Sequence, residues 1–240
     1  MKNKIKTSIL ILSVILVSSF GPSNKLSKIL SNYAKSVTKE FNQIPEDRKN
    51  ALKEIGDYIV EQRTANKTCK LLFICTSNSR RSHFGQIWAS TASLYYGVDS
   101  IVAFSGGTEA TKVNINAINA LKRAGFGASS AGNPENPTWT IVNGAKGGQL
   151  LVYSKKYSDI QNPKKDFAAL MVCSEADKSC PFVDGADMRI ALPYDDPKYF
   201  DNTPSQEQKY DERCREISRE MFFMFDYVKT KLILKSESKK

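Results

Sequence analysis

Several features that would indicate common protein classes are missing from this 240-residue sequence. It contains a single histidine, His83, and no two cysteines are separated by only two residues, so the ligand spacing of a structural zinc site is absent. The sequence has no internal repeat, and no block of lysine and arginine is long enough to act as a nucleic-acid-binding arm. We therefore expect neither a metal nor another cofactor, and no nucleic acid partner.

The composition is that of a globular protein with an excess of positive charge. Hydrophobic residues make up 41% of the chain and charged residues 25%, and 35 Lys and Arg against 25 Asp and Glu give a net charge of +10. The length favours one globular domain with additional segments over two full domains. A modest positive field also suits an enzyme that attracts small oxyanions.

One segment carries a pattern typical of nucleophilic catalysis. Residues 70–75 form an apolar stretch that ends in Cys75, a polar loop follows, and helical periodicity resumes at Ser82. A strand, loop and helix in this order bring backbone N–H groups and a helix N-terminus to one anion, and the same field favours a cysteine thiolate. Arg81, six positions after the cysteine, adds a guanidinium that can hold two oxygens of an oxyanion. We expect an oxyanion site here, with Cys75 as the nucleophile.

The remaining loop residues are expected to bind the oxyanion or to hold the loop. The Ser82 hydroxyl can donate to the Cys75 sulfur and stabilise its thiolate form. Asn78 can lock the loop, because asparagine tolerates unusual backbone angles. Arg80 either contributes its backbone N–H or simply faces solvent. The candidate oxyanion-binding residues are Thr76, Ser77, Asn78, Ser79, Arg80 and Ser82.

From residue 70 to about residue 230, the sequence resembles the low-molecular-weight tyrosine phosphatase superfamily, in particular its thioredoxin-coupled arsenate reductases. Three segments carry the resemblance in the same order and spacing: residues 75–82, residues 171–181 and residues 193–197. One departure is visible, because those reductases usually have a second cysteine just before the loop arginine, where this chain has Arg80. This change adds a positive charge beside the pocket.

The resemblance implies a role for each of three further residues. Asp196, immediately before a proline, would be the general acid, with Asp195 as its obvious competitor. Cys173 would attack the Cys75–arsenic adduct and release arsenite, and Cys180 would then form a disulfide with Cys173. A thioredoxin-like reductant would restore the thiols. The alternative is a tyrosine or small-molecule phosphatase, which needs only the nucleophile, the arginine and the acid.

Other interpretations of the cysteines and of the site remain open at this point. Cys173 and Cys180 can form a fixed disulfide in an exported protein. Cys214 falls in a predicted helix and is expected to be a packing residue, whereas Cys69 has no predicted role. A non-enzymatic oxyanion-binding protein would use the same loop without turnover. The sequence does not indicate an oligomeric state.

The two ends of the chain are expected to lie outside the catalytic domain. Residues 1–21 combine three lysines with an apolar run and have the form of a secretory signal, or of an uncleaved membrane anchor, so we expect an exported protein. Residues 22–67 have helical periodicity with a break at residues 44–45 and are expected to form a helical extension that packs on the domain. Residues 68–232 would form the phosphatase-like domain, and residues 233–240 a flexible tail.

Within the domain, short apolar runs alternate with helical patterns. Strands are expected at residues 71–75, 100–104, 149–153, 168–173 and 188–192, and helices at residues 82–96, 114–124 and 205–232. This alternation predicts a three-layer α/β fold around a central, mainly parallel doubly wound sheet. Between residues 133 and 156, turn residues between β-prone runs suggest a hairpin, either as a wall of the site or as an edge extension. Ligands of such sheets bind at the carboxyl ends of the strands, where Cys75 and Cys173 are both expected.

Overall fold

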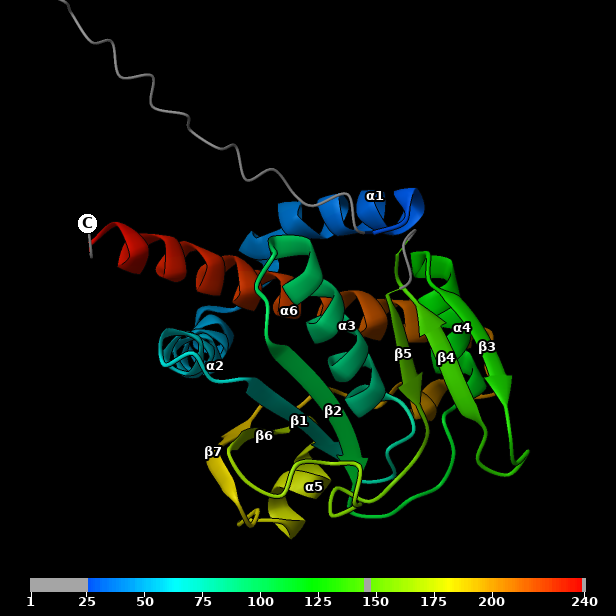
Figure 1. Cartoon of the computed structure of the whole chain (residues 1–240). Helices are drawn as coiled ribbons and strands as arrows, with labels where there is room; N and C mark the ends of the chain where they lie inside the picture. The colour runs from blue at the N-terminus through cyan, green and yellow to red at the C-terminus, as the bar shows by residue number, and fades with distance from the viewer. Residues whose placement is uncertain (1–25, 145–147, 239–240) are drawn as a thin grey trace, which may run out of the picture.

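The computed structural model describes residues 26–144 and 148–238 (Figure 1). The predicted signal segment, residues 1–21, lies outside the described residues. The elements, in chain order, are α1 (Lys28–Val37), η1 (Thr38–Gln43), α2 (Glu46–Thr64), β1 (Cys69–Cys75), α3 (Arg81–Tyr96), β2 (Ile101–Gly107), α4 (Ile115–Ala124), β3 (Gly127–Ala131), β4 (Thr138–Val142), β5 (Gln149–Val152), β6 (Phe167–Met171), α5 (Ser174–Ser179), β7 (Ala186–Ala191), η2 (Pro197–Phe200) and α6 (Gln206–Glu237).

Four strands form a parallel sheet in the order β2-β1-β6-β7, which confirms the predicted α/β class. The central strand β1 is apolar and almost entirely buried, as expected of a strand covered on both faces. Leu71 pairs with Ala168 and Ile74 with Met171, so β1 and β6 end at the same edge of the sheet. This register places Cys75 and the chain after Met171 at one edge, as the sequence predicts.

Helix α3 packs closely on β1 and β2 because a glycine lies at the contact. A Cβ atom at Gly85 would lie 2.3 Å from the Phe73 ring, so any larger residue would push the helix away from the strand. Trp88 and Phe84 on the same helix are completely buried. The contact fixes the height of the α3 N-terminus relative to the end of β1, and thereby the shape of the loop between them.

The second sheet is antiparallel and differs from one expectation. Strand β5 was expected, at residues 149–153, to join the parallel sheet, but it pairs with β4 in a separate sheet of order β3-β4-β5. The hairpin suggested by the turn residues is formed by β4 and β5. A short apolar run has the same pattern in either kind of sheet, and only its partner strand distinguishes them.

The helical extension precedes the sheet and packs against α6. Ser27 caps α1 by accepting a hydrogen bond from Leu30 N at 3.2 Å, and α2 begins after Pro45 with Glu46 and Asp47 in its first turn. Figure 1 shows α1 lengthwise beside the long helix α6, and α2, seen nearly end-on, close to the C-terminal part of that helix. That helix continues beyond the expected end at residue 232, to Glu237, so most of the segment expected as a flexible tail is helical.

Candidate active site

Cys75 ends β1 at the bottom of the predicted loop, and its sulfur is placed for stabilisation as a thiolate. The Sγ atom lies 3.1 Å from Ser82 Oγ. Asn78 Nδ2 donates to the same Ser82 oxygen at 2.9 Å. Because this amide occupies an acceptor position of Ser82, the single hydroxyl proton is free to point at the sulfur. The N-terminus of the 16-residue helix α3 follows the loop directly, at a place where backbone N–H groups can bind an anion.

Asn78 is the residue that holds the loop in shape. Its φ is +43°, a left-handed conformation that asparagine adopts more easily than most residues. Its Oδ1 accepts from the backbone N–H of Lys155 at 2.8 Å, and its carbonyl oxygen lies 2.8 Å from His83 Nε2. The side chain is completely buried. Three elements therefore meet at this one residue, in agreement with the role predicted for it.

The end of β2 supports the loop from the side and requires a glycine. Thr108 N donates to Cys75 O at 3.1 Å, and Glu109 N to Thr76 O at 3.0 Å. A Cβ atom at Gly107 would lie 2.5 Å from Thr76 O and 2.7 Å from Asn78 N. The loop and β2 are closer than a side chain permits, so only glycine allows these hydrogen bonds.

Arg81 connects the loop to the segment with the predicted acid. Its Nη2 donates to Asp196 Oδ2 at 2.7 Å, and its Nη1 donates to the carbonyl oxygen of Tyr194 at 2.8 Å. Asp196 Oδ1 accepts from Lys198 N at 3.1 Å, which caps the short helix η2. The side chains of Arg81 and Asp196 are less than a tenth exposed. The neighbouring Asp195 has a side chain that is 98% exposed, which separates the two acids that the sequence left in competition.

These groups line a cavity of about 170 Å³. Its charged residues are three cations (Arg80, Arg81 and Lys198) and three carboxylates (Glu109, Glu175 and Asp196). Cys75, Thr76, Ser77 and Ser79 complete the lining. The three cations supply the positive charge that binding of an oxyanion requires.

The sequence suggested that Arg80 is either a simple backbone donor or a solvent-facing charge. The structure shows that it is neither. Its Nε donates to Tyr210 OH at 2.7 Å and its Nη2 to Asp201 Oδ2 at 3.2 Å. These contacts turn the guanidinium toward α6 while the residue still lines the cavity. Sequence reasoning missed both partners because they lie more than 120 residues away, with no local pattern to mark them.

Three further cavity residues were not predicted. Ser77 Oγ donates to Glu109 Oε1 at 2.7 Å, so Glu109 fixes the outer part of the loop. Glu175 lies within the cysteine-bearing segment and its Oε2 is 3.9 Å from Arg81 Nη1. Lys198 follows the acid by two residues. Glu175 and Lys198 each lie two residues from a predicted site residue, and this proximity could have indicated them. Glu109 has no predicted site residue so close in the sequence.

Cys173 lies beside the loop, and Cys180 lies at the far end of α5. Cys173 Sγ is 3.4 Å from Thr76 Oγ1 and accepts a hydrogen bond from Ala176 N at 3.3 Å, so the thiol caps the first turn of α5. Cys180, which is half-buried, does not line the cavity. Arg189 holds this end of α5 by donating to Cys180 O at 2.9 Å. All five cysteines are free thiols.

The other two cysteines are kept protonated by their surroundings. Burial raises the pKa of Cys69 to about 12, and it raises the pKa of Cys214 to about 12 as well. Trp88 Nε1 donates to Cys214 Sγ at 3.3 Å inside the core. The packing role predicted for Cys214 agrees with these contacts, because a thiol with so high a pKa is a poor nucleophile.

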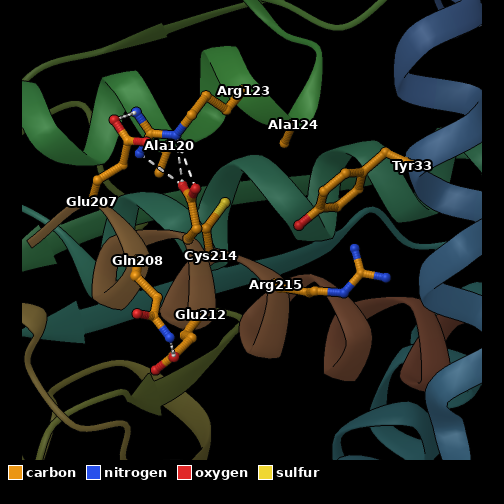
Figure 2. A pocket seen from close by; sticks show the side chains of 10 residues that line it. Tyr33, Ala120, Arg123, Ala124, Glu207, Gln208, Glu212, Cys214 and Arg215 are labelled. Atoms are coloured by element: carbon orange, nitrogen blue, oxygen red, sulfur yellow. Dashed lines mark hydrogen bonds and ion pairs between the residues drawn. The ribbon is translucent and has the colours of Figure 1, made fainter. Parts of the chain in front are cut away.

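A larger cavity, of about 510 Å³, lies away from the loop and reaches Cys214 (Figure 2). Figure 2 shows Arg123 pointing toward Glu207, and the guanidinium also pairs with Asp211 at 2.8 Å. Arg215, on the other side, pairs with Glu40. Since these cations already have carboxylate partners, the cavity has little capacity to bind a small anion, and its size does not make it the catalytic site.

Residues 26–144 and 148–238 contain neither a candidate metal site nor a candidate membrane span. No group of three or more His, Cys, Asp or Glu side chains in these ranges is arranged to hold a metal ion. Within the same ranges, no helix combines the length and the apolar character that a membrane span requires.

His83 is buried behind the loop and gives a testable acid dependence. Burial, helped by the nearby Lys155 ammonium, lowers the pKa of His83 from 6.5 to about 3. Between these pH values the unfolded chain binds one proton more than the folded chain at this residue. The free energy of unfolding should therefore fall on acidification below pH 6.5, by up to about 1.4 kcal/mol per pH unit from this group.

Urea unfolding at pH 7.5, 5.5 and 4.5 measures this effect in the wild type and in His83→Gln. The variant is expected to lose less stability on acidification than the wild type, because glutamine does not titrate. Equal acid dependence in the two proteins would contradict the assignment. His83 is 1% exposed, which accounts for the lowering of its pKa by burial.

Curated relatives of this chain are arsenate reductases. The sequence is 30% identical over 127 residues to arsenate reductase 2 of Staphylococcus epidermidis. The aligned region covers 53% of this chain and 77% of that protein. The chain belongs to the arsenate reductase family. It is also 32% identical over 127 residues to the arsenate reductase of Brevibacillus brevis, with 53% of this chain and 75% of that protein aligned. No family model matches the chain.

Solved structures that are similar to this chain include a phosphatase and an arsenate reductase. A low-molecular-weight phosphotyrosine phosphatase of Vibrio cholerae covers 66% of this chain and 95% of its own, with 12% identity and a TM-score of 0.45. A thioredoxin-dependent arsenate reductase of Corynebacterium glutamicum covers 80% of this chain and 94% of its own, with 15% identity and a TM-score of 0.34. These scores are low, so membership in the arsenate reductase family rests on the sequence relatives. The predicted resemblance to arsenate reductases and the prediction of an enzyme of that kind are confirmed.

Proposed function

We propose that this protein is a thiol-dependent arsenate reductase in which Cys75, Cys173 and Cys180 act in turn. The observation that carries the proposal is the 3.4 Å contact between Cys173 Sγ and the Thr76 hydroxyl, because Thr76 directly follows the nucleophile. A phosphatase needs no second thiol at this place. The arsenate reductases among the relatives of this chain support the same substrate.

The first step uses the groups around the cavity. The Cys75 thiolate attacks arsenic, Arg81 holds oxygens of the arsenate, and Asp196 gives its proton to the oxygen that leaves as water. For this step the Asp196 carboxylate has to leave Arg81, from which it accepts a hydrogen bond in this structure. An oxyanion at Arg81 would replace the carboxylate there and make its protonated form more favourable.

The second step moves electrons to arsenic. The Cys173 thiolate attacks the Cys75 sulfur, the sulfur–arsenic bond breaks with its electron pair on arsenic, and As(V) leaves as As(III) arsenite. The Cys180 thiolate then attacks Cys173, which forms a Cys173–Cys180 disulfide and frees Cys75. A dithiol reductant of the thioredoxin kind returns both cysteines to thiols.

Helix α5 must unwind for this exchange. Cys173 and Cys180 flank its six residues, and seven residues of helix span about 10 Å, whereas the Cα atoms of a disulfide lie about 4.4–6.8 Å apart. A helix this short has little stability of its own. Its tertiary anchor is Arg189, which donates to Asp177 Oδ1 at 2.6 Å and to Cys180 O at 2.9 Å. Release of Arg189 from these two acceptors would accompany the relay.

The test is mass analysis of the reduced protein after one equivalent of arsenate, with free thiols trapped. The proposal expects one arsenite released, a loss of two protons and a peptide-level Cys173–Cys180 linkage. Free thiols at Cys75, Cys173 and Cys180 and no released arsenite would overturn it.

A protein tyrosine or small-molecule phosphatase is the second candidate. It is favoured by one observation, namely that Cys173 is completely buried at the cap of α5, while Cys75, Arg81 and Asp196 already surround the cavity.

The acid assignment can be tested against its neighbour. Asp196→Asn should lower the single-turnover rate of arsenite release by about 10²- to 10³-fold, because the leaving oxygen then receives no proton from the enzyme. Asp195→Asn should change this rate by less than about twofold, since an exposed side chain contributes little. Rapid-quench measurement of arsenite compares the two variants. Equal losses would contradict the assignment of Asp196.

Export of the protein remains our proposal, supported by the lysine-rich and apolar character of residues 1–21. An exported compartment is generally oxidising, so a thioredoxin-like partner at the membrane or beyond it would have to reduce the Cys173–Cys180 pair. Fractionation of cells that express the full chain tests this location. Recovery of the full-length protein in the cytoplasm alone would overturn it.

A further inference from the structure

A buried charge pair connects the N-terminal extension to the segment before the proposed acid. Arg48 of α2 donates from Nε to both carboxylate oxygens of Glu220 on α6, at 3.0 and 2.9 Å. Glu220 also accepts from the hydroxyl of Tyr194 at 2.6 Å. The side chains of Arg48 and Glu220 are 16% and 4% exposed, and Tyr194 is 5% exposed. The three groups therefore interact in surroundings where water weakens them little.

Arg48 makes two more contacts with the same segment. Its Nη2 donates to the carbonyl oxygen of Leu192 at 3.3 Å, and its guanidinium carbon lies 4.4 Å from the centre of the Tyr194 ring. This one side chain thus binds the segment at the end of β7 and again two residues later. A planar guanidinium serves both contacts and the carboxylate together, which a lysine would not do.

The segment passes this restraint on to the catalytic groups. The carbonyl oxygen of Tyr194 accepts from Arg81 Nη1 at 2.8 Å, and Asp196, two residues further, accepts from Arg81 Nη2 at 2.7 Å. Leu192 to Asp196 have no regular secondary structure, and on one side their backbone is held at the end of β6, where Leu192 N donates to Met171 O at 2.9 Å and Tyr194 N donates to Val172 O at 3.2 Å. The ring and hydroxyl of Tyr194, held by Arg48 and Glu220, are what restrain this stretch from the side of α2 and α6.

We propose that Arg48, through Glu220 and Tyr194, is a positioning residue for Arg81 and Asp196, so that the N-terminal extension is part of the catalytic apparatus. This inference rests on the roles proposed above for Arg81 and Asp196. It goes beyond the sequence-based interpretation of the extension, which was an accessory layer packed on the domain. The physical basis is that a displacement of a catalytic group by about 1 Å costs up to about 10²-fold in rate.

The chain offers a matched control for the test. Glu40 of η1 also ties the extension to α6, by pairing with Arg215, and its side chain is 20% exposed. Its ion-pair partners Arg215 and Arg219 both lie on α6 and not in the acid segment. Glu40→Gln therefore weakens the attachment of the extension without touching the Tyr194 segment.

The experiment measures the single-turnover rate of arsenite release in the full chain. Arg48→Met is expected to lower the rate about tenfold, Tyr194→Phe about threefold, and Glu40→Gln by less than about twofold. Tyr194→Phe leaves the Arg48–Glu220 pair in place, so it remains informative if Arg48→Met folds poorly. Thermal unfolding of each variant shows whether its loss of rate follows its loss of stability.

A double-mutant cycle separates positioning from general weakening. In the Asp196→Asn background, Arg48→Met is expected to cost less than its tenfold loss in the wild type, because one of the two groups that it positions is already lost. Rate losses of Arg48→Met and Tyr194→Phe no larger than that of Glu40→Gln would overturn the inference, and so would a tenfold loss by Arg48→Met that persists beside Asp196→Asn. If the wild type releases no arsenite, the same cycle is measured with p-nitrophenyl phosphate. A wild type inactive on both substrates would overturn the proposed function together with this inference.

Discussion

Cys75→Ser is expected to lower both arsenite release and aryl phosphate hydrolysis by about 10⁴-fold or more, the loss typical of a removed nucleophile. A serine hydroxyl at the end of β1 can still approach Ser82, but it is not a thiolate at neutral pH. The helix N-terminus and the loop then have no anion on the enzyme to stabilise. Steady-state and single-turnover assays with arsenate and with p-nitrophenyl phosphate measure the loss.

Binding has to be measured on the same variant. The loop, Arg81 and the α3 N-terminus are unchanged in Cys75→Ser, so phosphate or arsenate should still bind, and the melting temperature should stay within a few degrees of the wild type. A variant that retains substantial turnover would show that Cys75 is not the nucleophile. Tight binding without turnover in the wild type as well would instead indicate an oxyanion-binding protein.

Cys173→Ser and Cys180→Ser are expected to abolish multiple turnover of arsenate while leaving Cys75 able to attack once. Cys173→Ser should release no arsenite, because no thiol can then displace the Cys75–arsenic adduct. Cys180→Ser should release one equivalent and stop as a Cys75–Cys173 disulfide. Burst amplitude, together with peptide mapping of the trapped protein, distinguishes the two variants.

A matched control for these variants is Cys214→Ser, whose thiol is buried far from the loop and outside the cavity of Cys75. It should retain full multiple turnover if it folds, with some loss of stability from the buried hydroxyl. Full arsenate turnover by Cys173→Ser would contradict the relay. Full aryl phosphate hydrolysis by both relay variants, with no arsenate reduction by the wild type, would establish the phosphatase.

The local signals in the sequence were sufficient wherever one stretch of chain carries the whole feature. The expected strand at residues 71–75, the polar loop and the following helix appear in the structure with shifts of two residues at most. Cys75, Asn78 and Ser82 lie within eight residues, so their contacts depend on loop geometry that the residue types themselves favour. The parallel order of the central sheet also followed from the alternation of strands and helices.

Features that depend on distant partners were not predictable in this way. Residues 149–153 have an apolar pattern that suits either sheet, and the neighbouring strand β4 decided between them. Arg80 was expected to be a backbone donor or a surface charge, because nothing near it indicates Tyr210 or Asp201. The Arg48–Glu220 pair joins residues 172 positions apart. Such contacts arise only when helices pack.

The sequence by itself pointed to the proposed chemistry: a cysteine and an arginine around a loop, an acid before a proline and two further cysteines, in an order and spacing that resemble those of arsenate reductases. These features are local, because the patterns that indicate a strand, a loop or a helix lie in neighbouring residues. Tertiary structure alone decided which acid faces Arg81, which thiol reaches the loop, and that a helix outside the recognised domain holds the acid segment. These depend on burial and on contacts across the fold, since hydrogen bonds and ion pairs become strong and specific only where packing excludes water.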